Sequence, residues 1–142
     1  MKKDADKEPA MSAREKADIL LRAALTKKAS DPVLIRLGEL SSLTDFFLIV
    51  SARSGRQVKA IAEAIIEESR GRGFKPFSVE GLGQGHWALL DYGDVIVHVF
   101  FGPTREFYDL EGLWAEAPRE RLPEEILQEL QAAKGTYDEE EW

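Results

Sequence analysis

The sequence predicts an α/β (α+β) fold, with a mixed sheet of about five strands flanked by helices. Segments with helical spacing of apolar residues alternate along the chain with short β-branched or aromatic runs. One of these runs, residues 46–50, is apolar on both faces, which indicates a central strand covered on both sides. The length of 142 residues suits one domain with its own core.

The first helix is predicted to begin after Ser12, because Ser12 and Glu15 form a capping box in which each side chain satisfies a backbone donor. Residues 30–32, Ser-Asp-Pro, end it. A β-branched run over residues 33–37 and a turn over residues 38–42 then lead into the apolar run. We interpret the two runs as antiparallel neighbours in the sheet.

The second helix is predicted from another capping box, Ser54 with Gln57, and from apolar residues at helical spacing. Two glycines, Gly71 and Gly73, end it. Residues 74–79 indicate a strand, which Pro76 places at an edge of the sheet. Residues 81–85, Gly-Leu-Gly-Gln-Gly, indicate a flexible loop.

A β-hairpin is predicted next, with strands over residues 87–90 and 95–101 joined by the turn Asp-Tyr-Gly-Asp. Gly93 supplies the positive φ that a tight turn requires. Pro103 suits the first turn of a following helix, in which Phe107, Leu110 and Trp114 fall on one side.

The two ends of the chain differ from its middle. Residues 1–11 are predicted to be a flexible tail, and residues 12–117 the folded domain. Residues 118–142 are predicted to be an acidic extension, partly helical or disordered, with a short helix over residues 123–133 and a run of carboxylates over residues 137–142.

Composition bounds the function. The chain has 19 Lys and Arg against 26 Asp and Glu, and no clustered basic patch, which disfavours direct binding to nucleic acid. A partner on an RNA machine is therefore expected to be a basic protein. The sequence has no cysteine, no apolar run of membrane-spanning length and no secretory signal at its start, so we expect a cytoplasmic protein.

The polar residues of the hairpin have two interpretations. Asp91 and Asp94, with His86 or His98, could form an acid/base pair or bind a hard cation. Aspartate beside a two-residue turn more often bonds nearby backbone amides, and His98 shares a strand face with apolar neighbours, which indicates a buried histidine bonded to backbone or carboxylate. We predict no catalytic residue, no metal site and no cofactor.

Trp87 is the residue whose place the pattern leaves open. It begins a strand beside the glycine-rich loop, and core packing and a role as an interface anchor are equally consistent with that position. The loop itself resembles a phosphate-binding loop only superficially, because it precedes a strand and has no lysine.

Three separated motifs resemble the ribosomal silencing factor S family, also called the Iojap-like family, over residues 13–117. They are SSLTDFFLIVSARSGRQVKAIAEAIIEE, VEGLGQGHWALLDYGDVIVHVF and REFYDLEGLW, in that order. The resemblance implies a nucleotidyltransferase-like fold without known catalysis. It also implies binding to the large ribosomal subunit through universal ribosomal protein L-fourteen, which blocks subunit joining and lowers translation when nutrients are scarce. Mitochondrial relatives act in assembly of the large subunit.

The resemblance also assigns residues and partners. It places partner contact on the hairpin, at Trp87, Leu89, Asp91, Tyr92 and Gly93. It includes Thr44, Asp45 and His98 as motif positions whose role is open between structure and contact. It implies a possible homodimer as well. A nucleotidyltransferase-like enzyme is the alternative, which the reversed order Ser54-Gly55 and the spacing of the two aspartates disfavour.

Overall fold

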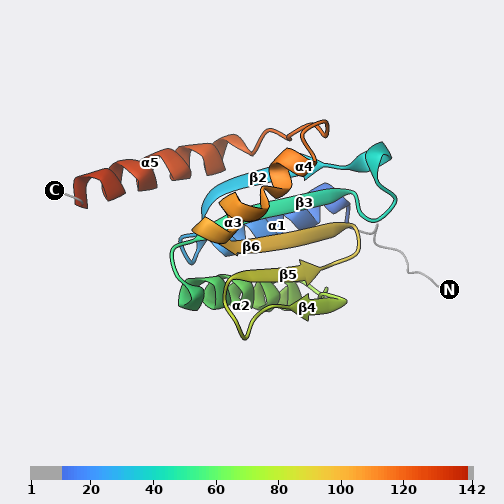
Figure 1. The fold of residues 1–142 in the computed structure, drawn as a ribbon, viewed down its shortest axis with the longest axis horizontal. Coiled ribbons are helices and arrows are strands. Elements are labelled where there is room, and N and C mark those ends of the chain that lie inside the picture. The colour runs from blue at the N-terminus through green and yellow to red at the C-terminus, as the bar shows by residue number, and fades with distance from the viewer. Residues whose placement is uncertain (1–10, 141–142) are drawn as a thin grey trace.

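A five-stranded mixed sheet with helices on both sides organises the chain (Figure 1). The computed structural model describes residues 11–140, and its strand order is β2-β3-β6-β5-β4. The elements are α1 (Ala13–Leu25), β2 (Ser30–Arg36), the 3₁₀ turn η1 (Gly38–Leu40), β3 (Phe46–Ala52), α2 (Gly55–Gly71), β4 (Ser78–Glu80), β5 (Trp87–Asp91), β6 (Val95–Phe101), α3 (Gly102–Tyr108), α4 (Leu110–Leu113) and α5 (Glu124–Glu140). The predicted fold class is confirmed, whereas its nucleotidyltransferase-like character stays a prediction.

The central strand is β3, as the apolar run predicts. All seven of its residues are buried, and it pairs antiparallel with β2 and parallel with β6. Strand β2 begins at Ser30, earlier than predicted. Asp31 adopts a left-handed conformation (φ 51°) there, and the register shifts at this point, so the strand starts as a bulge soon after α1.

The two long helices begin at their predicted caps. In α1 the capping box is complete, because the Ser12 hydroxyl accepts from the Glu15 amide at 3.0 Å and the Glu15 carboxylate accepts from the Ser12 amide at 2.8 Å. In α2 only half of the predicted box forms. Ser54 caps the helix, but the side-chain oxygen of Gln57 accepts from the Arg53 backbone amide. The side-chain NH₂ of Gln57 donates to two backbone carbonyls in the loop after α1.

The predicted hairpin and a strand at the sheet edge are confirmed, but the edge strand is Ser78–Glu80, whereas the sequence predicts residues 74–79, so Pro76 lies before it. β4 lies at the edge of the sheet but has only three residues, and β5 and β6 form the antiparallel hairpin. The loop between β4 and β5 packs closely on backbone. A Cβ on Gly81 would lie 1.9 Å from the Trp87 carbonyl oxygen, and one on Gly85 would lie 2.9 Å from Gly55 Cα. These two glycines therefore permit a close approach that no other residue allows.

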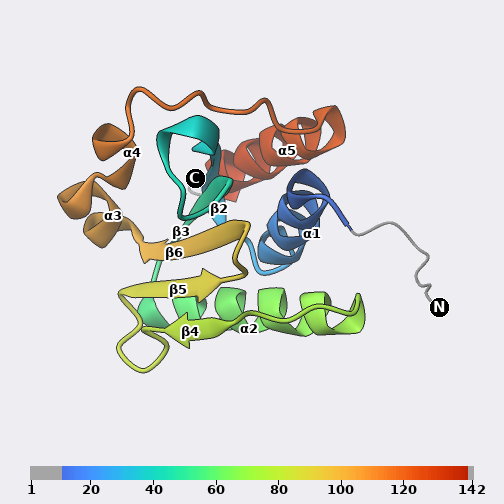
Figure 2. The same ribbon diagram turned by 90° about the vertical axis from the view of Figure 1, so that its right-hand side faces the viewer.

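The sheet buries different side chains on its two faces. Helices α1 and α2 lie on one face, and α3 and α4 lie on the other (Figure 2). The α1–α2 face carries the larger core, which includes Leu122 and Ile126 from the C-terminal extension. The second core is smaller and joins Ile35, Phe47, Ile49 and Phe100 to Leu110 and Trp114. Within residues 11–140, every helix is too short or too polar to cross a membrane.

The prediction of one continuous helix after Pro103 is wrong. Asp109 adopts a left-handed conformation (φ 47°) and its carboxylate accepts from the Gly112 amide, so α3 ends and α4 starts there. As a result Phe107 is 80% exposed, while Leu110 and Trp114 pack on the sheet.

The predictions for the two chain ends can be compared with the structure only in part. Helix α5 is longer than the predicted helix over residues 123–133. The predicted flexible tail over residues 1–11 lies outside the described residues except for Met11, and so do the last two residues of the predicted acidic end.

Candidate partner-binding surface

The outer face of β5 lies beside α3 and α4 and is only partly covered by them. Trp87, Leu89 and Asp91 alternate along β5 and therefore point to this face, opposite Phe100, His98 and Ile96 of β6. Figure 1 shows α3 and α4 over β2, β3 and β6, with β5 and β4 beside them. All three β5 side chains are half-buried, so each presents part of its surface to solvent.

Trp87 is both packed and accessible, which answers the question that its sequence position leaves open. Its ring lies 4.7 Å from the Phe100 ring and 5.0 Å from the Tyr108 ring, centroid to centroid. Its indole N–H donates to His98 Nδ1 at 3.1 Å. These contacts hold the indole in one orientation while part of its surface remains open to solvent.

His98 is a buried, neutral residue that orients Trp87. It is 3% exposed, and burial lowers its pKa to about 4. Nδ1 accepts the indole hydrogen bond, and Nε2 has no hydrogen-bond partner among the described residues. The predicted burial is confirmed, but the partner is an indole, where the sequence favoured backbone or carboxylate.

The two hairpin aspartates serve different structural purposes. The Asp91 carboxylate accepts from the Gly93 amide at 2.8 Å, and Gly93 has the positive φ (89°) that the turn requires. Asp94 forms an ion pair with Lys16 of α1 at 3.1 Å. The predicted turn chemistry is thus confirmed for Asp91, whereas Asp94 pairs with Lys16 instead of a backbone amide. Among residues 11–132, whose side chains the structure describes, no group of three or more His, Asp or Glu is arranged to hold a metal ion.

Tyr92 and Gly93, which the resemblance places in the partner contact, are both largely covered by other parts of the chain. Tyr92 is only 3% exposed and packs in the α1–α2 core, where its hydroxyl bonds to Ser69 at 2.8 Å and its ring meets Phe74 edge-on. A partner on the β5 face cannot reach it, so the structure corrects this assignment. Gly93 is half-buried beneath Phe77, whose ring a Cβ on the glycine would meet at 2.8 Å.

Thr44 and Asp45, whose role the sequence leaves open, lie at the start of β3. Thr44 is buried and donates to the Phe46 carbonyl at 3.5 Å. Asp45 has an exposed side chain, and its amide donates to the Asp94 carbonyl at 3.1 Å. The backbone of this segment therefore ties the start of β3 to the hairpin turn, and only the Asp45 side chain is open to contact.

Sequence reasoning missed the contribution of α3 and α4 to this surface. Phe107, Tyr108 and Leu113 are 80%, 54% and 75% exposed. Arg105 sits beneath them, buried, and its guanidinium donates to Glu111 at 2.7 and 3.1 Å, to the Asp31 carbonyl at 2.8 Å and to the Ser51 hydroxyl at 2.7 Å. The family motif REFYDLEGLW contains Arg105 and the three exposed residues, so the sequence does single them out. The motif does not show that Arg105 is buried while Phe107, Tyr108 and Leu113 are exposed.

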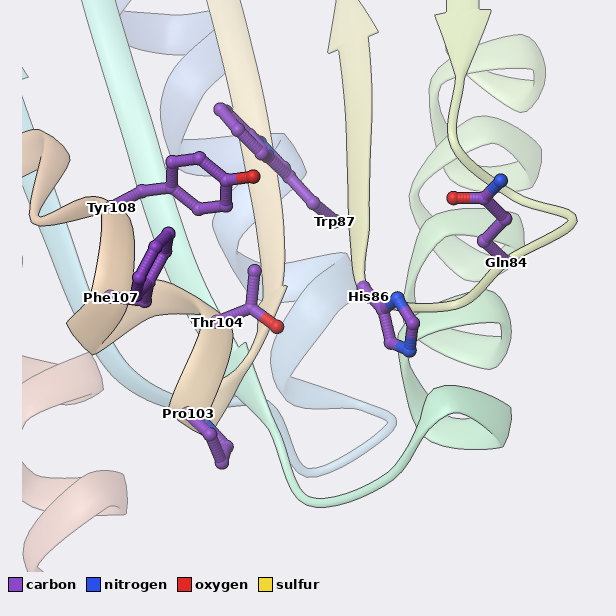
Figure 3. Close-up of a pocket in the computed structure, with 7 residues that line it drawn as sticks. All are labelled: Gln84, His86, Trp87, Pro103, Thr104, Phe107 and Tyr108. Carbon is purple, nitrogen blue, oxygen red and sulfur yellow. The ribbon is translucent and has the colours of Figure 1, made fainter.

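A groove separates α3 from the loop before β5, and we call it the β5–α3 groove. It encloses about 450 Å³ and is lined by Gln84, His86 and Trp87 on one side and by Pro103, Thr104, Phe107 and Tyr108 on the other. Figure 3 shows these side chains around the opening. The groove therefore continues the exposed face of β5 onto α3.

The fold and this surface together define an α/β domain that presents one open sheet face with an aromatic groove at its edge. A family model described as "Ribosomal silencing factor during starvation" matches residues 10–141, so the chain belongs to the ribosomal silencing factor family. The predicted family is confirmed, and the match extends beyond the residues 13–117 that the motifs cover.

Individual relatives agree with the family assignment. The chain is 38% identical over 112 residues to a ribosomal silencing factor of Halalkalibacterium halodurans, covering 79% of this chain and 96% of the relative. It is 27% identical to mouse "Mitochondrial assembly of ribosomal large subunit protein 1" over 78% of this chain and 54% of that protein. A crystal structure of a Chromobacterium violaceum protein superposes with a TM-score of 0.72 at 32% identity, covering 74% of this chain and 88% of the other.

Proposed function

We propose that this protein binds the large ribosomal subunit through universal ribosomal protein L-fourteen and thereby blocks joining of the small and large subunits. The consequence is repression of translation under nutrient limitation, in the cytoplasm, and the protein has a second role in large-subunit biogenesis. The family description and the name of the mouse relative support the ribosomal part of this proposal.

The observation that carries the proposal is the open, acidic face of β5. Residues 76–118, which form β4 to α4, contain a single cation, Arg105, against seven carboxylates. Arg105 is buried and paired with Glu111, so it offers no positive charge to a partner. The rest of the chain, with 18 cations and 19 carboxylates, is close to neutral. The negative charge of the protein is thus concentrated in the segment that carries Trp87 and Leu89, where Asp94 is paired with Lys16 of α1 and Glu111 with Arg105.

This distribution favours a basic protein over RNA as the direct contact. A phosphate backbone is repelled by such a face, whereas a basic ribosomal protein is attracted and steered onto it. The half-buried Trp87 and Leu89 supply an apolar centre within the charged rim, which is the usual composition of a protein interface.

The test is co-sedimentation of the purified protein with isolated large subunits, followed by addition of small subunits. Asp91→Asn is the sharpest variant, because asparagine keeps the oxygen that accepts from the Gly93 amide and removes only the charge. We expect it to weaken binding by about threefold, and raised salt to weaken the wild type. Glu63→Gln, an exposed carboxylate on α2 across the sheet, is the control and should bind normally.

Two results would contradict the proposal. One is an absence of large-subunit binding at micromolar protein, and the other is binding that leaves subunit joining unaffected. Equal weakening by Asp91→Asn and Glu63→Gln would leave only a general charge effect and would remove the β5 face from the contact.

Self-association is a second candidate, favoured by the exposed side chains of Phe107 and Leu113 near the same face. A homodimer that buries them would compete with ribosome binding. Light scattering at tens of micromolar protein tests it, and a monomer there would count against it. The enzyme alternative has no comparable support, since Ser54 caps α2 and the carboxylates of Asp91 and Asp94 bond to different partners.

A further inference from the structure

The β5–α3 groove combines aromatic rings with polar groups that have no internal partner. Trp87, Phe107 and Tyr108 provide the rings. The side chains of Gln84 and Thr104 also face it, and neither hydrogen-bonds to another side chain or backbone group in the described part of the chain. Both can accept a hydrogen bond through oxygen. A ligand that fits this groove therefore combines a flat group that stacks on the rings with polar atoms, because Gln84 and Thr104 can each donate as well as accept a hydrogen bond.

The groove holds no lysine or arginine that would repel a cation. Its lining residues include His86 but no lysine, arginine or carboxylate, and Glu106, next to Phe107 on α3, lines a separate pocket. The Trp87, Phe107 and Tyr108 rings carry no cation from within the described residues, where the one such contact is Lys16 over Phe74 at 5.8 Å. The ring faces are thus available to a positive group from outside.

We propose that the β5–α3 groove receives an arginine side chain from a basic protein partner, with its guanidinium against the aromatic wall and Gln84 and Thr104 as acceptors. Arginine matches the groove better than lysine, because its planar guanidinium both stacks on aromatic faces and presents five donors. Its apolar stem suits the rings at the mouth. The proposal deepens the proposed function, on which the identity of the partner rests, by naming the chemistry that the groove takes from that partner.

The first test uses N-acetyl-arginine amide as the probe, with N-acetyl-citrulline amide as an uncharged probe of nearly the same shape. Two-dimensional NMR of the full chain follows the Trp87 indole N–H and the Thr104 and Phe107 amides during titration. We expect saturable shifts with arginine at millimolar concentrations and at least about fivefold weaker binding of citrulline. Shifts that do not saturate, or equal binding of the two probes, would overturn the proposal.

Variants locate the site and connect it to the partner. Phe107→Ala removes part of the wall, and Leu43→Ala is its control, because both side chains are exposed and only Phe107 lines the groove. Phe107→Ala should weaken both the probe and large-subunit binding by about threefold or more, and Leu43→Ala neither. Gln84→Glu should tighten the probe and Gln84→Lys should abolish its binding.

The outcomes separate this inference from the proposed function. If large subunits bind but the arginine probe does not, the groove proposal fails and the proposed function stands. If the probe binds and Phe107→Ala leaves large-subunit binding unchanged, the groove is not where the partner contributes its arginine, and the proposal fails as well. If large subunits do not bind at all, the proposed function fails, and the probe titration still decides whether the groove takes arginine.

Discussion

Replacing Glu111 with glutamine is expected to lower the free energy of unfolding by about 2 to 3 kcal/mol. The Glu111 carboxylate binds the Arg105 guanidinium through two hydrogen bonds of 2.7 and 3.1 Å, and the two side chains are only 19% and 10% exposed. Glutamine keeps one oxygen that can accept, but its NH₂ group would face a guanidinium N–H, and two donors cannot bond to each other. The variant therefore leaves a buried cation with one fewer acceptor and no counter-charge.

The magnitude follows from what remains around Arg105. Hydrogen bonds to the Asp31 carbonyl and the Ser51 hydroxyl, at 2.8 and 2.7 Å, persist in the variant. They satisfy part of the guanidinium, so the loss stays below the roughly 3 to 5 kcal/mol found when a buried pair is broken without other partners. Partial solvent access to Glu111 reduces it further.

The assay is urea unfolding of wild type and Glu111→Gln across a pH series. The pKa of Glu111 is lowered mainly by the hydrogen bond from Arg105. A carboxylate whose folded-state pKa is depressed stabilises fully above its unfolded pKa and loses that contribution as pH falls through the folded pKa. The difference between the two proteins should thus be full at pH 7 and shrink below about pH 4.3.

A surface pair supplies the control for this experiment. Glu68→Gln removes the partner of Arg72, where both side chains are about half exposed, and should cost less than about 0.5 kcal/mol. A Glu111→Gln loss as small as the Glu68→Gln loss, or one that does not change with pH, would refute the reasoning that Arg105 and Glu111 anchor α3 and α4 to the sheet.

Three further predictions concern the interior. The free energy of unfolding of the wild type should fall by up to about 3 kcal/mol between pH 6.5 and pH 4, because burial lowers the pKa of His98 to about 4. In urea unfolding over the same pH range, His98→Gln should lose less. Tyr92→Phe should cost about 1 kcal/mol, because the tyrosine donates to Ser69, and should leave large-subunit sedimentation unchanged; a clear loss of binding would contradict its burial. Gly81→Ala should lower Tm by at least about 5 °C and Gly83→Ala by about 1 °C or less, because a Cβ on Gly81 meets backbone at 1.9 Å and one on Gly83 meets nothing within 4 Å.

Local signals explain what the sequence predicts well. The capping box at Ser12, the apolar run over residues 46–50 and the hairpin around Gly93 depend on neighbours a few residues away, and the structure has all three. The family motifs likewise place the exposed face of β5. The break at Asp109 escapes the pattern because α3 and α4 together keep an approximate helical spacing, although one left-handed residue separates them.

Long-range contacts explain what the sequence does not predict. Arg105 finds its partners 74 and 54 residues away, on β2 and β3, so no local pattern identifies it as a buried anchor. Tyr92 lies inside the turn, where strand alternation no longer determines which face a side chain takes. Its place in the core is decided by Ser69, 23 residues away on α2.

The two walls of the β5–α3 groove are fixed by these same interior contacts. On one side His98 holds the Trp87 indole, and the close approach of Gly81 to the backbone holds the start of β5. On the other side Arg105 ties α3 to two strands of the sheet. Because Trp87 and the backbone of α3 are ordered by folding, a partner that binds the groove has to immobilise mainly the exposed side chains of Gln84, Phe107 and Tyr108. A small surface with such preorganised walls can therefore bind more tightly than its area alone implies, since less of the contact free energy is lost to ordering.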